Sequence, residues 1–137
     1  MLTITRRFEF EAAHYLPNHL GKCRQIHGHS YKMDVTIAGS ICNDEKSPRM
    51  GMLIDFAELN DIVKPVIAHC EEDPNKSIDH GLLNNIFSHP TAEVMVEWFA
   101  NAIQKSIDEK FPMGDVWVHR VDLWENSHSY ASWTKNA

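Results

Sequence analysis

The chain has 137 residues with a formal charge of -6 at pH 7, 43% hydrophobic residues and 9% aromatic residues. This length suits a single domain spanning residues 1–137, and the apolar content is enough for a packed core, which excludes an intrinsically disordered chain. The acidic balance disfavours nonspecific binding to nucleic acid or to an anionic membrane, because both are held mainly by Lys and Arg.

Two long strands are predicted near the N-terminus. Residues 2–11 alternate apolar and polar side chains, and this half-buried strand continues toward His14. Residues 29–39, HSYKMDVTIAG, show the same period of two and predict a second strand. We expect the two strands to pair antiparallel through the loop that contains Cys23.

Two amphipathic helices are predicted in the middle of the chain. Asp55 and Glu58 have the spacing of a capping box at a helix start, and Pro65 should kink that helix or mark its true start. Thr91 is the predicted N-cap of a second helix. Its predicted buried stripe consists of Met95, Trp98, Phe99, Ala102, Ile103 and Ile107.

The C-terminal part predicts two further strands. Residues 116–125, VWVHRVDLWE, change the phase of their apolar positions between Val118 and Val121, which indicates a β-bulge. A short last strand is expected over 129–133. This order predicts an α+β domain with a four-stranded antiparallel sheet, two helices on one face, and exposed sheet edges available for assembly.

The compartment expected from the sequence is the cytoplasm. Three cysteines at unrelated spacings fit reduced thiols better than a disulfide framework. The N-terminus becomes charged at Arg6 and has no apolar core of a signal peptide, and no run is long enough to span a bilayer.

Three histidines form the main candidate metal site. His27 and His29 project to the same side of the second predicted strand, and antiparallel pairing brings His14 alongside them. Three imidazoles without a fourth protein ligand are typical of catalytic zinc, which keeps an open coordination position. The competing interpretation is that Gly28 makes a turn on which the histidines are merely exposed.

Cys23 is a candidate base or nucleophile, because the thiolate is the reactive form of cysteine and a nearby cation favours it. It lies in a polar loop beside Lys22 and Arg24, whereas Cys42 and Cys70 fit the role of small buried apolar residues. Lys22, Arg24 and His19 are candidates for binding an anion.

Asp79, His80 and Glu125 are the remaining candidates. From the sequence alone we expect Asp79 to be the N-cap of a helix over LLNNIF, and the alternative is a proton-transferring pair with His80. Glu125 ends a predicted strand, so it is either a solvated strand end or an acceptor for a ligand edge with adjacent N–H donors.

Six segments in this order resemble the 6-pyruvoyltetrahydropterin synthase/6-carboxytetrahydropterin synthase family. They are FEAAH, CRQIHGHSY, GMLIDFAELN, IDHGLLNNI, HPTAEVMVEWF and WENS. The three residues between Cys23 and His27 are similar to the bacterial 6-carboxytetrahydropterin synthases of queuosine biosynthesis. Asn126 and Val94 depart from the family, which commonly has Thr and Asn at these positions.

The resemblance implies the tunnelling fold, homohexamers built from two trimers, and sites at subunit interfaces. It implies that His14, His27 and His29 bind zinc, that Cys23 is the catalytic base, that Asp79 and His80 relay protons, and that Glu125 anchors a pterin. The implied activity is that of a zinc-dependent lyase that converts 7,8-dihydroneopterin triphosphate to 6-carboxytetrahydropterin, acetaldehyde and triphosphate.

Two alternatives remain open at this point. A 6-pyruvoyltetrahydropterin synthase would share these residues and release no acetaldehyde. A noncatalytic zinc-binding module would use Cys23 as the fourth ligand of a closed tetrahedral site.

Overall fold

The computed structural model of the protein describes residues 1–136, so Ala137 lies outside the described residues. Its five strands are β1 (Leu2–His14), β2 (His27–Gly39), β3 (Gly81–Leu82), β4 (Val116–Trp124) and β5 (Tyr130–Thr134). Its α-helices are α1 (Phe56–Ile67) and α2 (Ala92–Lys110), and its short 3-10 helices are η1 (Lys22–Arg24), η2 (Pro74–Lys76) and η3 (Leu83–Asn85).

The sheet has the strand order β3-β1-β2-β4-β5. The predicted count of four antiparallel strands is wrong by one, because the two-residue strand β3 pairs parallel with β1. The other three pairings are antiparallel, as predicted. A strand of two residues has no periodicity that a sequence pattern can detect.

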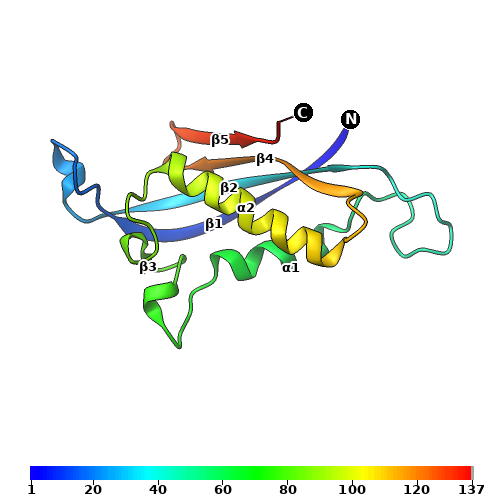
Figure 1. Cartoon of the computed structure of the whole chain (residues 1–137), viewed down its shortest axis with the longest axis horizontal. Coiled ribbons are helices and arrows are strands. Elements are labelled where there is room, and N and C mark those ends of the chain that lie inside the picture. The colour runs from blue at the N-terminus through cyan, green and yellow to red at the C-terminus, as the bar shows by residue number, and fades with distance from the viewer. Residues whose placement is uncertain (137) are drawn as a thin grey trace.

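Both helices lie on one side of the sheet, with α2 running across it and α1 beside β1 (Figure 1). Alternate residues of the long strands are buried on that side, among them Phe8, Phe10 and Met33, and they share one core with both helices. The opposite side is polar and carries cross-strand pairs such as Arg7 with Asp34. Side chains on the side of the sheet that carries the helices are therefore the ones that become buried.

The predicted bulge and the predicted helix starts are confirmed. The β2–β4 register shifts where Thr36 faces Arg120 and Ile37 faces Val118, which leaves His119 without an opposite residue. Thr91 caps α2, with its hydroxyl accepting the N–H of Val94. The stripe prediction is wrong at Trp98, which is 39% exposed.

The capping box at the start of α1 is part of a charged cluster. The side chain of Glu58 accepts the backbone N–H of Asp55, and Arg49 donates to both Glu58 carboxylate oxygens, at 2.8 and 2.5 Å. These bonds from Arg49 lower the pKa of Glu58 to about 2. Pro65 lies inside α1, so it does not mark the helix start.

Replacing Glu58 with glutamine should lower the free energy of unfolding at pH 7 by up to about 1 kcal/mol. The glutamine carbonyl can still accept the N–H of Asp55, but the partly exposed ion pair with Arg49 is lost. A depressed carboxyl pKa stabilises the fold above the unfolded-state value, and this contribution is lost as pH falls through the folded value. The difference in unfolding free energy between wild type and E58Q, measured by urea denaturation, should therefore become smaller as the pH falls from the ordinary carboxyl pKa of 4.5 to about 2. A difference that is constant over this pH range would contradict the assignment.

Within residues 1–136, neither helix combines the length and the apolar character needed to cross a bilayer.

Candidate metal centre and its surroundings

His14, His27 and His29 converge at one end of the β1–β2 pair. His14 is the last residue of β1 and lies directly opposite His27, the first residue of β2. The ring centroids are 4.6 Å apart for His14 and His27, and 5.0 Å apart for the other two pairs. One nitrogen from each ring lies within 4.8 Å of the others. The predicted convergence of the three rings is confirmed.

Backbone carbonyls fix how two of these rings present their nitrogens. Nδ1 of His14 is 2.7 Å from the carbonyl oxygen of Pro90, and Nδ1 of His27 is 2.8 Å from that of Gln25. Because a carbonyl oxygen only accepts, Nδ1 carries the proton in both rings and Nε2 keeps a lone pair. A metal-binding histidine in proteins has this same second contact.

Two buried nitrogens of this group have no hydrogen-bond partner, which suits a role as metal ligands. Nε2 of His14 and Nε2 of His29 are both buried and neither has a hydrogen-bond partner. Buried polar atoms of this kind are rare and mark an unfilled ligand position. Imidazole nitrogens suit zinc better than magnesium or calcium. The three histidines therefore form a group that could hold a metal ion, and zinc stays the prediction from the sequence.

The electrostatics of His29 favour the neutral, metal-binding form. Burial lowers the pKa of its imidazole, the Glu125 carboxylate opposes this shift, and the other two rings lower the pKa further. Oε1 of Glu125 is 3.1 Å from Nε2 of His29, at an angle that makes no hydrogen bond. A neutral ring can donate its lone pair to a cation without first losing a proton.

Cys23 lies in η1, in the connection between β1 and β2. Its carbonyl oxygen accepts the N–H of Leu16, which closes the connection two residues beyond His14. Within residues 1–136, the side-chain atoms that lie close enough together to bind one ion are nitrogens of the three histidines. The half-buried sulfur of Cys23 is not among them. This arrangement favours an open site over a closed tetrahedral site with a sulfur ligand.

The other polar residues of this connection are exposed. Lys22 and Arg24 flank Cys23 at the surface, and Nδ1 of His19 accepts the N–H of Gly21. Binding of an anion by His19, Lys22 and Arg24 stays a prediction.

The structure places Asp79 and His80 side by side, immediately before β3. Nδ1 of His80 is 3.0 Å from Oδ1 of Asp79. The N-cap prediction for Asp79 is wrong, because the next helical segment is η3, whose N-cap is Leu82. Instead Oδ1 of Asp79 accepts the backbone N–H of Glu11 in β1. This contact joins residues far apart in the sequence, so local patterns do not reveal it.

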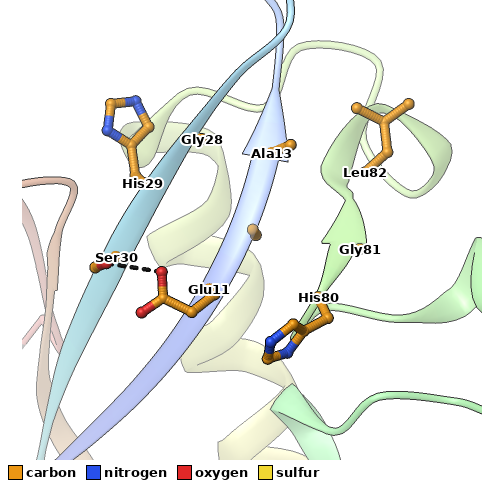
Figure 2. A pocket seen from close by; sticks show the side chains of 9 residues that line it. Glu11, Ala13, Gly28, His29, Ser30, His80, Gly81 and Leu82 are labelled. Carbon is orange, nitrogen blue, oxygen red and sulfur yellow. Dashed lines mark hydrogen bonds between the residues drawn. The ribbon is translucent and has the colours of Figure 1, made fainter.

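Within one chain, His80 is separated from His29 by strand β1 (Figure 2). His80 lines a cavity of about 550 Å³ together with Glu11, Ser30 and the backbone near Gly28. His29 borders the same cavity, but β1 runs between it and His80, and its ring points away (Figure 2). By strand alternation His29 shares the helix side with Tyr31, whereas Glu11 and Ser30 are on the opposite side.

Glu125 connects the histidines to a second cavity. It follows β4, and its N–H donates to the carbonyl of Ser129 across the turn to β5. The cavity next to it has a volume of about 490 Å³. Its lining consists of Ala92, Glu93, Glu125, Asn126, Ser129, Tyr130 and Ala131. Glu125 therefore lies both against His29 and on the wall of this cavity.

Sequence reasoning missed two contacts of His14. One is the Pro90 carbonyl, and the other is Tyr31, whose hydroxyl is 3.4 Å from Nδ1 of His14. Burial raises the pKa of the Tyr31 phenol, so the hydroxyl keeps its proton. The period of two along β2 carries the signal for Tyr31, because it follows His29 by two residues. No local signal marks Pro90.

Comparison with known proteins agrees with this geometry. Residues 3–136 match the 6-pyruvoyl tetrahydropterin synthase family. A relative from Synechocystis sp. named 6-carboxy-5,6,7,8-tetrahydropterin synthase is 32% identical over 133 residues, covering 96% of this chain and 92% of the relative. A relative of the same name from Rickettsia typhi is 34% identical over 145 residues, covering 95% and 98%.

The fold is also similar to a solved structure. The 6-pyruvoyl tetrahydropterin synthase of Caenorhabditis elegans superposes with a TM-score of 0.76 at 20% identity, covering 98% of this chain and 96% of that one. This likeness confirms the predicted fold class, and the family match over residues 3–136 confirms the resemblance drawn from the sequence. The chain belongs to the 6-pyruvoyl tetrahydropterin synthase family.

Proposed function

We propose that the chain is a 6-carboxy-5,6,7,8-tetrahydropterin synthase. It would convert 7,8-dihydroneopterin triphosphate and water to 6-carboxy-5,6,7,8-tetrahydropterin, acetaldehyde and triphosphate, in the cytoplasm and as part of queuosine biosynthesis. The names of the relatives that cover most of the chain support this reaction. The observation that carries the proposal is the convergence of His14, His27 and His29, with Nε2 of His14 and of His29 buried and without a hydrogen-bond partner.

The metal proposed for this site is zinc, held by the three histidines. Bound there, zinc would act as a Lewis acid toward oxygens of the substrate side chain and ease enolisation. The protein's part is to hold the three rings in place. The Pro90 and Gln25 carbonyls orient His14 and His27 and leave Nε2 of each ring available.

The proposed proton-transfer groups are Cys23 and the Asp79–His80 pair. Cys23 lies in the connection between the two strands that carry the histidines, so its thiolate would act as the base close to them. Asp79 holds the His80 ring through the 3.0 Å contact, and the ring would pass protons as the carbon-carbon bond breaks.

The assembly proposed is a homohexamer formed by two trimers. Strand β1 separates His80 from His29 of the same chain (Figure 2), so a second copy would have to supply the Asp79–His80 pair to a metal site. The β1 edge supports such an assembly, because β3 pairs only with Ala12 and Ala13 and leaves most of β1 free on that side. Sedimentation analysis tests this: a mass of six chains supports the assembly, and a monomer contradicts it.

Glu125 is the proposed anchor for the pterin ring. An ionised carboxylate accepts two parallel N–H bonds from the pyrimidine edge, and Glu125 lines the cavity of about 490 Å³ beside the histidines. Replacing it with glutamine should raise KM about 10- to 100-fold, since a hydrogen bond to a charged group contributes roughly 1.5–3 kcal/mol. Steady-state kinetics measures this, with Glu93→Gln on the same cavity as the control. An unchanged KM in E125Q would rule Glu125 out as the anchor.

Product analysis tests the proposed reaction. Zinc-loaded protein is incubated with 7,8-dihydroneopterin triphosphate, the pterin product is identified by mass spectrometry, and acetaldehyde is assayed in the same sample. Formation of 6-carboxytetrahydropterin with equimolar acetaldehyde supports the proposal. A 6-pyruvoyl product without acetaldehyde supports the other activity of the family, and no turnover of this substrate contradicts both.

A further inference from the structure

The Asp79–His80 turn has an unusual backbone conformation. His80 has a φ angle of 58°, and within residues 1–136 it is the only non-glycine residue whose φ is positive. Such a conformation persists only where the surrounding structure holds it, and it is often found at functional sites. The side chain of His80 is 69% exposed, so packing of its ring does not hold the turn. The restraint must come from the backbone and from neighbouring residues.

One restraint comes from β1. The N–H of His80 donates to the carbonyl of Glu11 at 2.6 Å, and the N–H of Glu11 donates to Oδ1 of Asp79 at 2.9 Å. Gly81 and Leu82 then continue as β3 beside Ala12 and Ala13. These hydrogen bonds hold the side of the turn that faces β1. They do not hold its other side.

The other restraint comes from Ser77, which is 1% exposed. Its hydroxyl oxygen accepts the N–H of Cys70 at 2.7 Å and donates to the Cys70 carbonyl at 3.3 Å. The hydroxyl therefore joins the two ends of the segment 70–77, whose residues between these ends are mostly exposed. Both bonding functions of a serine hydroxyl are used in this contact.

Ser77 also lies directly against the turn. A Cβ atom added to Gly81 would be 2.0 Å from the carbonyl oxygen of Ser77, so the two backbones touch and only glycine fits there. Between them the N–H of Asp79 donates to the Ile67 carbonyl at the end of α1, and the N–H of Gly81 donates to the Ile78 carbonyl. A shift of Ser77 would pass directly to Asp79 and His80.

We propose that Ser77 is a positioning residue for the Asp79–His80 pair, and that its buried hydroxyl keeps the pair in the conformation that presents His80 to the cavity. The catalytic half of this inference rests on the proposed function, because it assumes that the pair transfers protons. The positioning half rests on the contacts alone. Within residues 1–136, the lining of the cavity does not include Ser77.

Amide hydrogen exchange tests the positioning half without any activity measurement. In Ser77→Ala the N–H groups of Glu11, Asp79 and His80 should exchange about tenfold faster, the factor that corresponds to loss of one typical hydrogen bond. Ser106→Ala is the matched control, because the Ser106 hydroxyl also donates to a backbone carbonyl, that of Ala102 in α2. Wild-type exchange at these three amides in S77A would overturn the proposal.

A double-mutant cycle tests the catalytic half. S77A should lower kcat about 10- to 100-fold, while KM and zinc content stay at the wild-type level. In a His80→Ala background, S77A should cause no further loss, because Ser77 acts only through His80. A loss of the same factor in both backgrounds would mean that Ser77 stabilises the fold in general and would overturn the proposal.

Ser77→Cys provides a second variant if S77A does not fold. Its side chain has a similar shape and replaces the hydroxyl with a thiol, which is only a weak hydrogen-bonding group, so it should give the same faster exchange and the same non-additive loss of kcat. Wild-type exchange and kcat in S77C would overturn the proposal. If wild type does not turn over 7,8-dihydroneopterin triphosphate, the proposed function fails, and the exchange experiment still decides the positioning role.

Discussion

Replacing His14 with alanine is expected to release the metal and abolish turnover. His14 is 1% exposed, its Nδ1 faces a carbonyl, and its Nε2 has no hydrogen-bond partner, so the ring is held for a ligand outside the chain. Loss of one of three ligands should weaken zinc binding by more than the 10- to 100-fold typical of losing an outer-shell contact. Zinc content after desalting and kcat at limiting zinc measure the two effects.

His119→Ala is the matched control for this experiment. His119 lies at the β-bulge of β4 and is not part of the three-histidine group. H119A should keep stoichiometric zinc and wild-type kcat, and circular dichroism should show that both variants are folded. If H14A were to keep stoichiometric zinc with wild-type affinity, the three-histidine site would be wrong.

Replacing Cys23 with alanine is expected to keep the zinc and the fold and to lower kcat about 10²- to 10⁴-fold. This range is the usual contribution of a positioned acid–base group. Zinc should remain because the three histidines form the candidate metal site and the sulfur of Cys23 is not part of it. The fold should remain because the hydrogen bond of Cys23 to Leu16 uses its backbone carbonyl, which alanine also has.

Cys42→Ala is the control for Cys23→Ala. Both thiols are half-buried and free, but Cys42 lies in the connection after β2, where its backbone pairs with Met52 and Gly51. C42A should keep wild-type kcat. Loss of zinc in C23A would instead support the closed site of a noncatalytic zinc-binding module, and wild-type kcat in C23A would remove Cys23 from the mechanism.

The sequence predicts the elements whose signals are local. Alternation along β1 and β2 places Phe8, Tyr31 and Met33 on the buried side, and the capping box at Asp55 and Glu58 marks the start of α1. The same alternation, combined with antiparallel pairing, brings the three histidines together. The metal group could be predicted because every step depends on periodicity within two neighbouring strands.

The features that depend on distant contacts could not be predicted. Asp79 was expected to cap a helix because its neighbours resemble a helix start, but the N–H of Glu11 in β1 binds its carboxylate instead. β3 exists only because Gly81 and Leu82 lie beside Ala12 and Ala13. Trp98 has the spacing of the buried stripe but lies at its border, where Phe87 packs against one edge of its ring. Tertiary contacts override local patterns in each of these cases.

The proposed site would need more than one chain, which would also limit prediction from sequence. The sequence groups the proposed catalytic residues by their resemblance to a family, whereas the structure places only Glu125 against the histidines. Within residues 1–136 the Cys23 sulfur lies outside the group of three imidazoles, and His80 lines a cavity that His29 borders from the other side of β1. In the proposed hexamer, the copy that supplies His80 would depend on contacts between chains, which local patterns in one chain do not describe.

The most direct measurement of the central claim is a crystal structure of the zinc-loaded protein, with anomalous scattering recorded at the zinc edge. The account predicts one anomalous peak per chain, bound by one nitrogen each of His14, His27 and His29 at about 2.0–2.1 Å. A water or a ligand should occupy the fourth position. A peak at another position, or a bond of about 2.3 Å from the Cys23 sulfur to the zinc, would contradict it.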